Sequence, residues 1–201
     1  LFEKKGIRLL HPNQKEAVVF AVSIESEKIN RKLEESFETS LIEKRQSVRK
    51  FSKQVVTRET IYRVLRHAQT SPSAANRREW EFLVVQDPKA QKKIAEMSPY
   101  AGPAREAAFL IILCANTEKI QKDPQGNLWW IQDMGACAQT ILLAAKEERL
   151  DGVWLGFYPD ENRVRALKEY LHCETACIPF AVLAIGYASE SYVKKERYDP
   201  H

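Results

Sequence analysis

The chain has few glycines, few cysteines and no long hydrophobic run, and each shortage excludes a class of protein. Its 7 glycines are scattered, so it contains neither the G-x-G-x-x-G fingerprint of a dinucleotide-binding turn nor a P-loop. Its 4 cysteines do not suggest a disulfide scaffold, which favours the reducing cytoplasm as its location. The best apolar run, Ala107 to Ala115, has the length of a strand, so we expect no membrane span.

An excess of charge of one sign is also missing. The 31 basic and 27 acidic residues are interspersed and leave a net charge of +4. This mild excess favours anionic ligands such as phosphorylated cofactors. Nucleic acid is not an expected partner, because its binding usually needs a concentrated basic face. The first residues carry no secretory signal pattern. The length of 201 residues and the apolar fraction of 44% suit one globular domain or one subunit of an oligomer.

Motifs for a metal or for nucleophilic catalysis are weak. His172, Cys173 and Cys177 form the one metal-like cluster, but it lacks a fourth ligand and the usual zinc spacing. We therefore expect no metal. The sequence supports no Ser-His-Asp arrangement. We expect Asp133 to be structural, and no carboxylate pair stands out for acid–base catalysis.

Helix-like and strand-like patterns alternate irregularly, which favours an α+β fold over a regular βαβ fold. We expect strands at Trp80 to Val85, Phe109 to Cys114, Gly152 to Leu155 and Ile178 to Tyr187. We expect helices at Asn30 to Lys44, after an N-cap at Thr57, after Asp87-Pro88, at Trp129 to Leu150 and at Pro159 to Leu171. Residues 1–29 match no pattern and are treated as an N-terminal extension of unknown role, followed by one domain at 30–201.

A short basic motif follows the first of these helices. Arg45 and Arg49 flank Ser47 within five residues. Arginine binds phosphate and planar anionic groups through two parallel hydrogen bonds, and a hydroxyl between two arginines is well placed to contact the same ligand. Gln46 could also donate. The alternative is an exposed, solvated loop.

A second motif comes one helix later, where Pro72, Ser73 and Asn76 precede Trp80. Two further stretches follow, Asp133 to Ala145 leading to Gly156, and Pro179 to Tyr187 followed by Lys195 and Arg197. The four stretches, in this order and near this spacing, resemble the nitroreductase family of FMN-dependent oxidoreductases. The resemblance extends from about Leu33 to the C-terminus.

The resemblance implies a central mixed β-sheet flanked by helices, in an intertwined homodimer whose flavins are each contacted by both subunits. It implies that the first motif binds the FMN phosphate and the pyrimidine edge of the flavin, and that the second motif reaches the flavin from the other subunit. It also implies that residues of the two further stretches complete the site. The implied FMN-binding residues are Arg45, Gln46, Ser47, Arg49, Pro72, Ser73, Asn76, Leu155, Gly156, Lys195 and Arg197.

The resemblance also implies that NAD(P)H transiently donates hydride to flavin N5 and that a nitroaromatic, quinone or related acceptor then takes the electrons by a ping-pong mechanism. No side chain needs to be catalytic, because N5 carries the chemistry. Reductive dehalogenation or flavin breakdown on the same fold is one alternative, for which Asn116 to Asn127 is the only lid-like insertion. A non-catalytic flavin-binding module is another.

The chain departs from the family pattern in the second motif. Arg78 and Glu79 stand where the family usually has Gln-Pro, which could alter the path of the loop and the reach of Asn76. Trp129 and Trp130 open the longest helix, and we expect them in the core or at a dimer interface rather than as a lid over the flavin.

Overall fold

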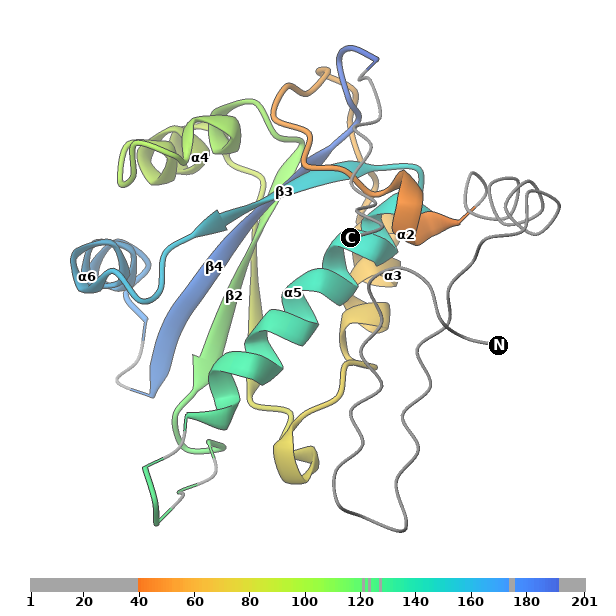
Figure 1. The fold of residues 1–201 in the computed structure, drawn as a ribbon. Helices are drawn as coiled ribbons and strands as arrows, with labels where there is room; N and C mark the ends of the chain where they lie inside the picture. Colours follow the sequence, from red (N-terminus) through yellow and green to blue (C-terminus); the bar gives the residue numbers. More distant parts are fainter. Residues whose placement is uncertain (1–39, 121, 123, 127, 174–175, 192–201) are drawn as a thin grey trace, which may run out of the picture.

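The computed structural model describes residues 40–120, 122, 124–126, 128–173 and 176–191 (Figure 1). The N-terminal extension at 1–29, together with Lys195 and Arg197, therefore lies outside the described residues. Of the helix expected at Asn30 to Lys44, the described part is α2, Leu41–Lys44.

In the described part of the chain, four strands form one sheet at the centre of the molecule. These are β1 (Trp80–Val85), β2 (Phe109–Asn116), β3 (Asp151–Gly156) and β4 (Cys177–Gly186), in the order β1-β2-β4-β3. All four lie where the sequence predicts strands.

All three neighbouring strand pairs are antiparallel. Among the described residues, the parallel pairing implied by a mixed sheet is limited to an isolated bridge between Ser47 and Gly152. The reason is topological. β2 and β3 point the same way and are joined through a helix, as parallel neighbours would be, but β4 is inserted between them and runs against both.

Three of the longer helices begin at residues whose side chains cap them, whereas the longest helix described, α5 (Trp129–Glu147), has no side-chain cap. Thr57 and Asp87 accept backbone hydrogen bonds at the starts of α3 (Arg58–Ala68) and α4 (Pro88–Ala95), and Asp160 does so for α6 (Glu161–Tyr170). No helix among the described residues has both the length and the hydropathy to cross a bilayer.

The helices cover both faces of the sheet, with α3 and α5 on one side and α4 and α6 on the other (Figure 1). Burial on both faces explains why the sequence of β2 is apolar without alternation. Phe109, Ile111 and Leu113 pack on the α5 side, while Leu110 and Ile112 pack on the other, and all five are fully buried. A strand buried on both faces reads as a continuous apolar run.

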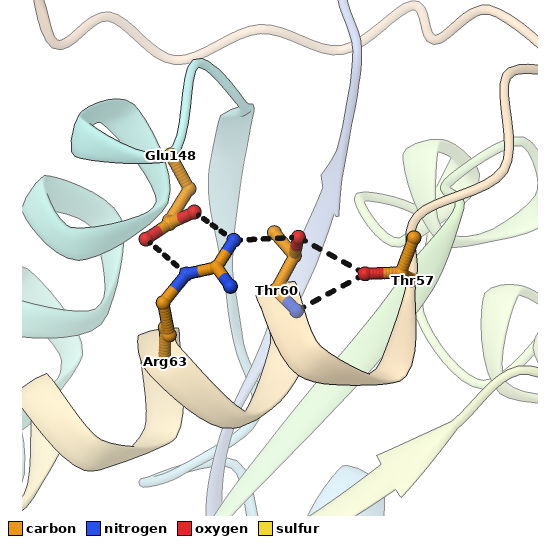
Figure 2. A network of polar contacts seen from close by, with 4 residues as sticks. All are labelled: Thr57, Thr60, Arg63 and Glu148. Atoms are coloured by element: carbon orange, nitrogen blue, oxygen red, sulfur yellow. Dashed lines mark hydrogen bonds and ion pairs between the residues drawn. The ribbon is translucent and has the colours of Figure 1, made fainter.

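An ion pair joins α3 to the end of α5 (Figure 2). Arg63 donates from Nε and Nη2 to the two carboxylate oxygens of Glu148, at 2.8 and 2.7 Å. The same Nη2 donates to Thr60 Oγ1, which also contacts the capping hydroxyl of Thr57. The contact joins α3, which leads into the second motif, to the end of α5, the helix that carries Asp133.

Candidate functional site

The basic motif lies across one end of the sheet. Ser47 bridges Gly152 at the start of β3, and the Val48 N–H donates to the Gly152 carbonyl at 3.1 Å. Farther on, Phe51 bridges Ala188 just beyond β4. Val48 and Phe51 are buried in the core, whereas Ser47 and Arg49 on either side of Val48 are exposed. Packing and main-chain bonds therefore hold the motif rigidly while its polar side chains face outward.

The charges of this motif are not neutralised within the described part of the chain. Arg45 and Gln46 are half-buried, and Arg49 is exposed. The ion pairs among the described residues involve neither arginine. Arg49 Nη1 donates only to the Ser47 carbonyl, at 3.2 Å. Two guanidiniums with donors to spare beside a hydroxyl form a suitable site for a phosphate or another planar anion.

The edge of β3 extends this site. β3 is an edge strand of the described sheet, so beyond the Ser47 bridge the outer side of its backbone is not paired with another described strand and can contact a ligand. The Gly156 carbonyl accepts from Arg163 Nη1 at 3.3 Å. The Leu155 side chain is buried, which leaves only its backbone for contact. Gly156 is exposed, and a Cβ added to it would meet nothing within 4 Å. The fold of the chain does not itself require glycine at 156, whereas close approach of a flat ligand would.

The second motif is a tight loop between α3 and β1. Its centre is η1, Ala74–Asn76. The Ser73 hydroxyl accepts from Arg78 N at 2.9 Å, and Asn76 Oδ1 accepts from Arg78 Nε at 2.8 Å. Pro72 and Asn76 are exposed, and Ser73 is half-buried. Arg78, one of the departures from the family pattern, thus shapes the loop and donates to the side-chain oxygen of Asn76. The side-chain N–H groups of Asn76 stay available to a ligand.

Three residues of this loop adopt left-handed backbone conformations. The φ angles are 51° at Ala75, 55° at Asn76 and 50° at Arg78. Each such conformation of a non-glycine residue costs on the order of 1–3 kcal/mol and persists only where its surroundings hold it. The hydrogen bonds of Ser73 and Arg78 do so here. Backbone strain of this kind concentrates at ligand-binding sites.

The two motifs lie at opposite ends of the sheet. The loop leads directly into Trp80, which pairs with Ala115 on β2. Ser47 lies at Gly152, whose partner Ile185 pairs with Phe109 at the other end of β2. At about 3.4 Å per residue, Phe109 and Ala115 are about 20 Å apart along the strand. β1 and β3 are also opposite edges of the sheet (Figure 1). One chain therefore does not bring both motifs to one small ligand.

One feature of the loop is missed by sequence reasoning. Glu79 is only 2% exposed, and Asp133 on α5 is 9% exposed. Asp133 Oδ2 accepts from the Ala74 N–H at 2.9 Å, which confirms its structural role. Burial and the adjacent Asp133 carboxyl raise the pKa of Glu79 to about 7. The only signal in the sequence is a carboxylate where the resembling family has proline.

Three of the four cysteines lie away from both motifs, whereas Cys137 on α5 donates to the Ala68 carbonyl just before the second motif. Cys114 and Cys177 are buried in the core on the α6 side of the sheet, with Cys173 packed beside them. All four cysteines are free thiols. Within the described part of the chain, no group of three or more His, Cys, Asp or Glu side chains is placed to hold a metal.

Comparison with known proteins decides the family. The profile of the nitroreductase family matches residues 42–102 and 97–187. The chain belongs to the nitroreductase family. A curated relative from Methanothermobacter thermautotrophicus, provisionally named NADH dehydrogenase/NAD(P)H nitroreductase, is 35% identical over 159 residues, which are 79% of this chain and 81% of the relative.

Solved nitroreductase-like structures share the fold. A provisionally named NADH oxidase from Clostridium acetobutylicum is 37% identical with a TM-score of 0.74, covering 80% of this chain and 95% of its own. A provisionally named nitroreductase from Desulfovibrio desulfuricans, solved in complex with FMN, is 26% identical with a TM-score of 0.67, covering 79% and 90%. The expected α+β nitroreductase fold is thereby confirmed, and membership of the family makes the chain an oxidoreductase.

Proposed function

We propose that this nitroreductase-family chain is an FMN-dependent NAD(P)H oxidoreductase that works as a homodimer, with each flavin contacted by both subunits. The observation that carries the proposal is the placement of the two motifs at opposite ends of one sheet. A single flavin held by both motifs needs the basic motif of one copy and the loop of another. We place the enzyme in the cytoplasm, which suits its four free thiols.

The phosphate end of the site is formed by the basic motif. Arg45 and Arg49 bind the phosphate and the electron-rich pyrimidine edge, Ser47 donates its hydroxyl, and Gln46 adds a further donor. Lys195 and Arg197, outside the described residues, complete the phosphate cage. The chemistry of the donor set fits FMN, because the charge of the two arginines is not compensated by described carboxylates.

The ring end of the site is formed by the edge of β3 and by the loop of the second copy. Gly156 has no side chain, so the isoalloxazine can approach the backbone closely. The neighbouring Leu155 also contacts the ring through its backbone, because its side chain is buried. The loop brings the Asn76 amide to one polar edge of the ring, and Pro72 and Ser73 hold the loop in place. From Gly152 to Gly156 the strand advances by about 13 Å, so the two ends of an extended cofactor can lie along one strand.

The residues described serve to bind, orient and tune. Bound FMN would supply the redox chemistry, taking hydride from NAD(P)H at N5 and passing electrons to a nitroaromatic, quinone or related acceptor in a ping-pong cycle. Positive charge from Arg45 or Arg49 near the pyrimidine edge favours the reduced, anionic ring and so raises the reduction potential. No side chain is required as a proton donor at N5.

Gly156→Ala tests the ring end of the site. The added methyl meets no protein atom within 4 Å, so the free energy of unfolding should stay close to that of the wild type. If the ring lies against this backbone, the methyl causes overpacking of roughly 1–3 kcal/mol, or about 5- to 150-fold weaker FMN binding. Flavin fluorescence titration of the apoprotein measures this loss.

The matched control is Gly102→Ala, because Gly102 also has nothing within 4 Å of an added Cβ and lies outside the proposed site. Equal FMN affinity in the two variants would contradict the assignment of Gly156.

The redox assignment is tested with the purified protein. NADH, and separately NADPH, is added anaerobically while the visible flavin absorption is recorded. We expect the band to bleach and then to return on addition of a quinone or nitroaromatic compound. A flavin that stays oxidised with both nicotinamides would instead support the non-catalytic flavin-binding module.

A further inference from the structure

Two carboxyl groups meet beneath the loop that carries Asn76. Glu79 is 2% exposed, and its Oε2 is enclosed without a hydrogen-bonding partner among the described residues. The Asp133 carboxyl lies within hydrogen-bonding reach of Glu79. Two adjacent buried carboxylates cannot both be ionised without a large cost in free energy. A proton on Glu79 removes that cost, because the neutral acid can donate to Asp133.

Little positive charge compensates this pair. Arg77, on the exposed end of the loop, acts on Glu79 more weakly than Asp133 does. Cys137, one turn farther along α5, is fully buried and donates to the Ala68 carbonyl at 3.7 Å. It adds no positive charge, and burial raises its pKa to about 12. The Asp133 oxygen Oδ2 is already engaged by the Ala74 N–H at 2.9 Å. The position of Asp133 is therefore coupled directly to the backbone of the loop.

We propose that Glu79 is a positioning residue, and that the proton it shares with Asp133 holds residues 73–76 in the shape that the flavin site of the second copy requires. With the proton present, Glu79 fixes Asp133 and Asp133 fixes Ala74. With the proton lost, two like charges repel each other, Ala74 moves with Asp133, and the left-handed conformations at Ala75 and Asn76 lose their support. This inference rests on the proposed function for its flavin part and on the carboxyl pair alone for its proton.

The direction of the pH effect follows from proton binding. The folded chain keeps the Glu79 proton up to about pH 7, whereas the unfolded chain loses it near 4.5. Between these values the folded state binds more protons, so the contribution of this group to stability falls as the pH rises. Above about pH 7 the ionised pair predominates, and we expect FMN affinity to fall.

Glu79→Gln tests the proposal, because the amide keeps the size and the donor of the neutral acid but does not titrate. In the wild type, the FMN dissociation constant should rise by up to about tenfold per pH unit above neutrality. In Glu79→Gln it should be independent of pH across the same range. A wild-type affinity that is independent of pH, or an inflection that remains in Glu79→Gln, would overturn the proposal.

Glu81→Gln is the matched control. Glu81 lies two residues away on β1 and is exposed, paired with Lys119 at 3.6 Å. The same change there should leave the inflection in place. If Glu81→Gln abolishes the inflection as well, the proton does not belong to Glu79.

A second measurement separates failure of this inference from failure of the proposed function. Apoprotein unfolding is compared between the wild type and Glu79→Gln across pH. The difference in unfolding free energy should shift in favour of the variant as the pH rises from 4.5 to about 7. A constant difference would overturn the shared proton. Absence of FMN binding at every pH would overturn the proposed function and the positioning role, while the unfolding data would still decide the proton.

Discussion

Arg45 and Arg49 suit a phosphate-binding role because neither forms an ion pair with a described carboxylate. The motif could be found from sequence because arginine is recognisable by type, and its backbone setting agrees with a binding role, since Val48 is buried between two exposed polar residues. Glu79 could not be found in this way. Its partner Asp133 is distant in the sequence, and only the fold shows that both are buried and adjacent.

Replacing both arginines should remove most of the affinity for FMN. Each charge-assisted hydrogen bond is worth roughly 1.5–3 kcal/mol, so Arg45→Ala with Arg49→Ala should weaken binding by about 10²–10⁴-fold. The flavin content of the purified protein and titration with FMN measure the loss. Arg66→Ala with Arg105→Ala removes the same charge from exposed positions elsewhere and should keep the flavin. Full flavin in the first double variant would rule out the basic motif as the phosphate site.

At the scale of elements, periodicity and caps were enough to place the strands and the main helices. Thr57 is the predicted cap of α3, and α4 begins directly after Asp87, as the sequence predicts. The order of the strands in the sheet could not be predicted from the sequence, because a strand that is apolar on both faces, such as β2, does not indicate which strands lie beside it. The insertion of β4 between β2 and β3 depends on contacts between distant segments. The resemblance implied a mixed sheet, whereas the strand pairs of the described residues are antiparallel.

The contact between Arg63 and Glu148 supports a prediction at this scale (Figure 2). The hydrogen bonds from Arg63 lower the pKa of Glu148 from 4.5, so the stabilisation is present above that pH and is lost as the pH falls through the lowered value. Arg63→Ala should reduce the thermal midpoint slightly near neutrality, because the arginine is half exposed. We expect the difference from the wild type to shrink in acid and in high salt. An unchanged difference in acid would show that Arg63 acts through packing alone.

At the scale of the whole molecule, the register of the sheet supports the proposal that one flavin site is built from two copies of the chain. The resemblance implied a shared flavin, and the pairings of Trp80 and Gly152 place the two motifs at opposite ends of the subunit. The division into an N-terminal extension at 1–29 and one domain at 30–201 stays a prediction, because residues 1–29 lie outside the described residues.

A heterodimer of two defective chains tests the shared site most directly. One chain carries Arg45→Ala with Arg49→Ala, the other carries Ser73→Ala with Asn76→Ala, and each alone should form a dimer that loses FMN. Co-expressed with different tags, the purified heterodimer has one site with both defects and one with none. The account predicts that it binds a single FMN per dimer with wild-type affinity. A heterodimer that binds no FMN would contradict a site built from two copies.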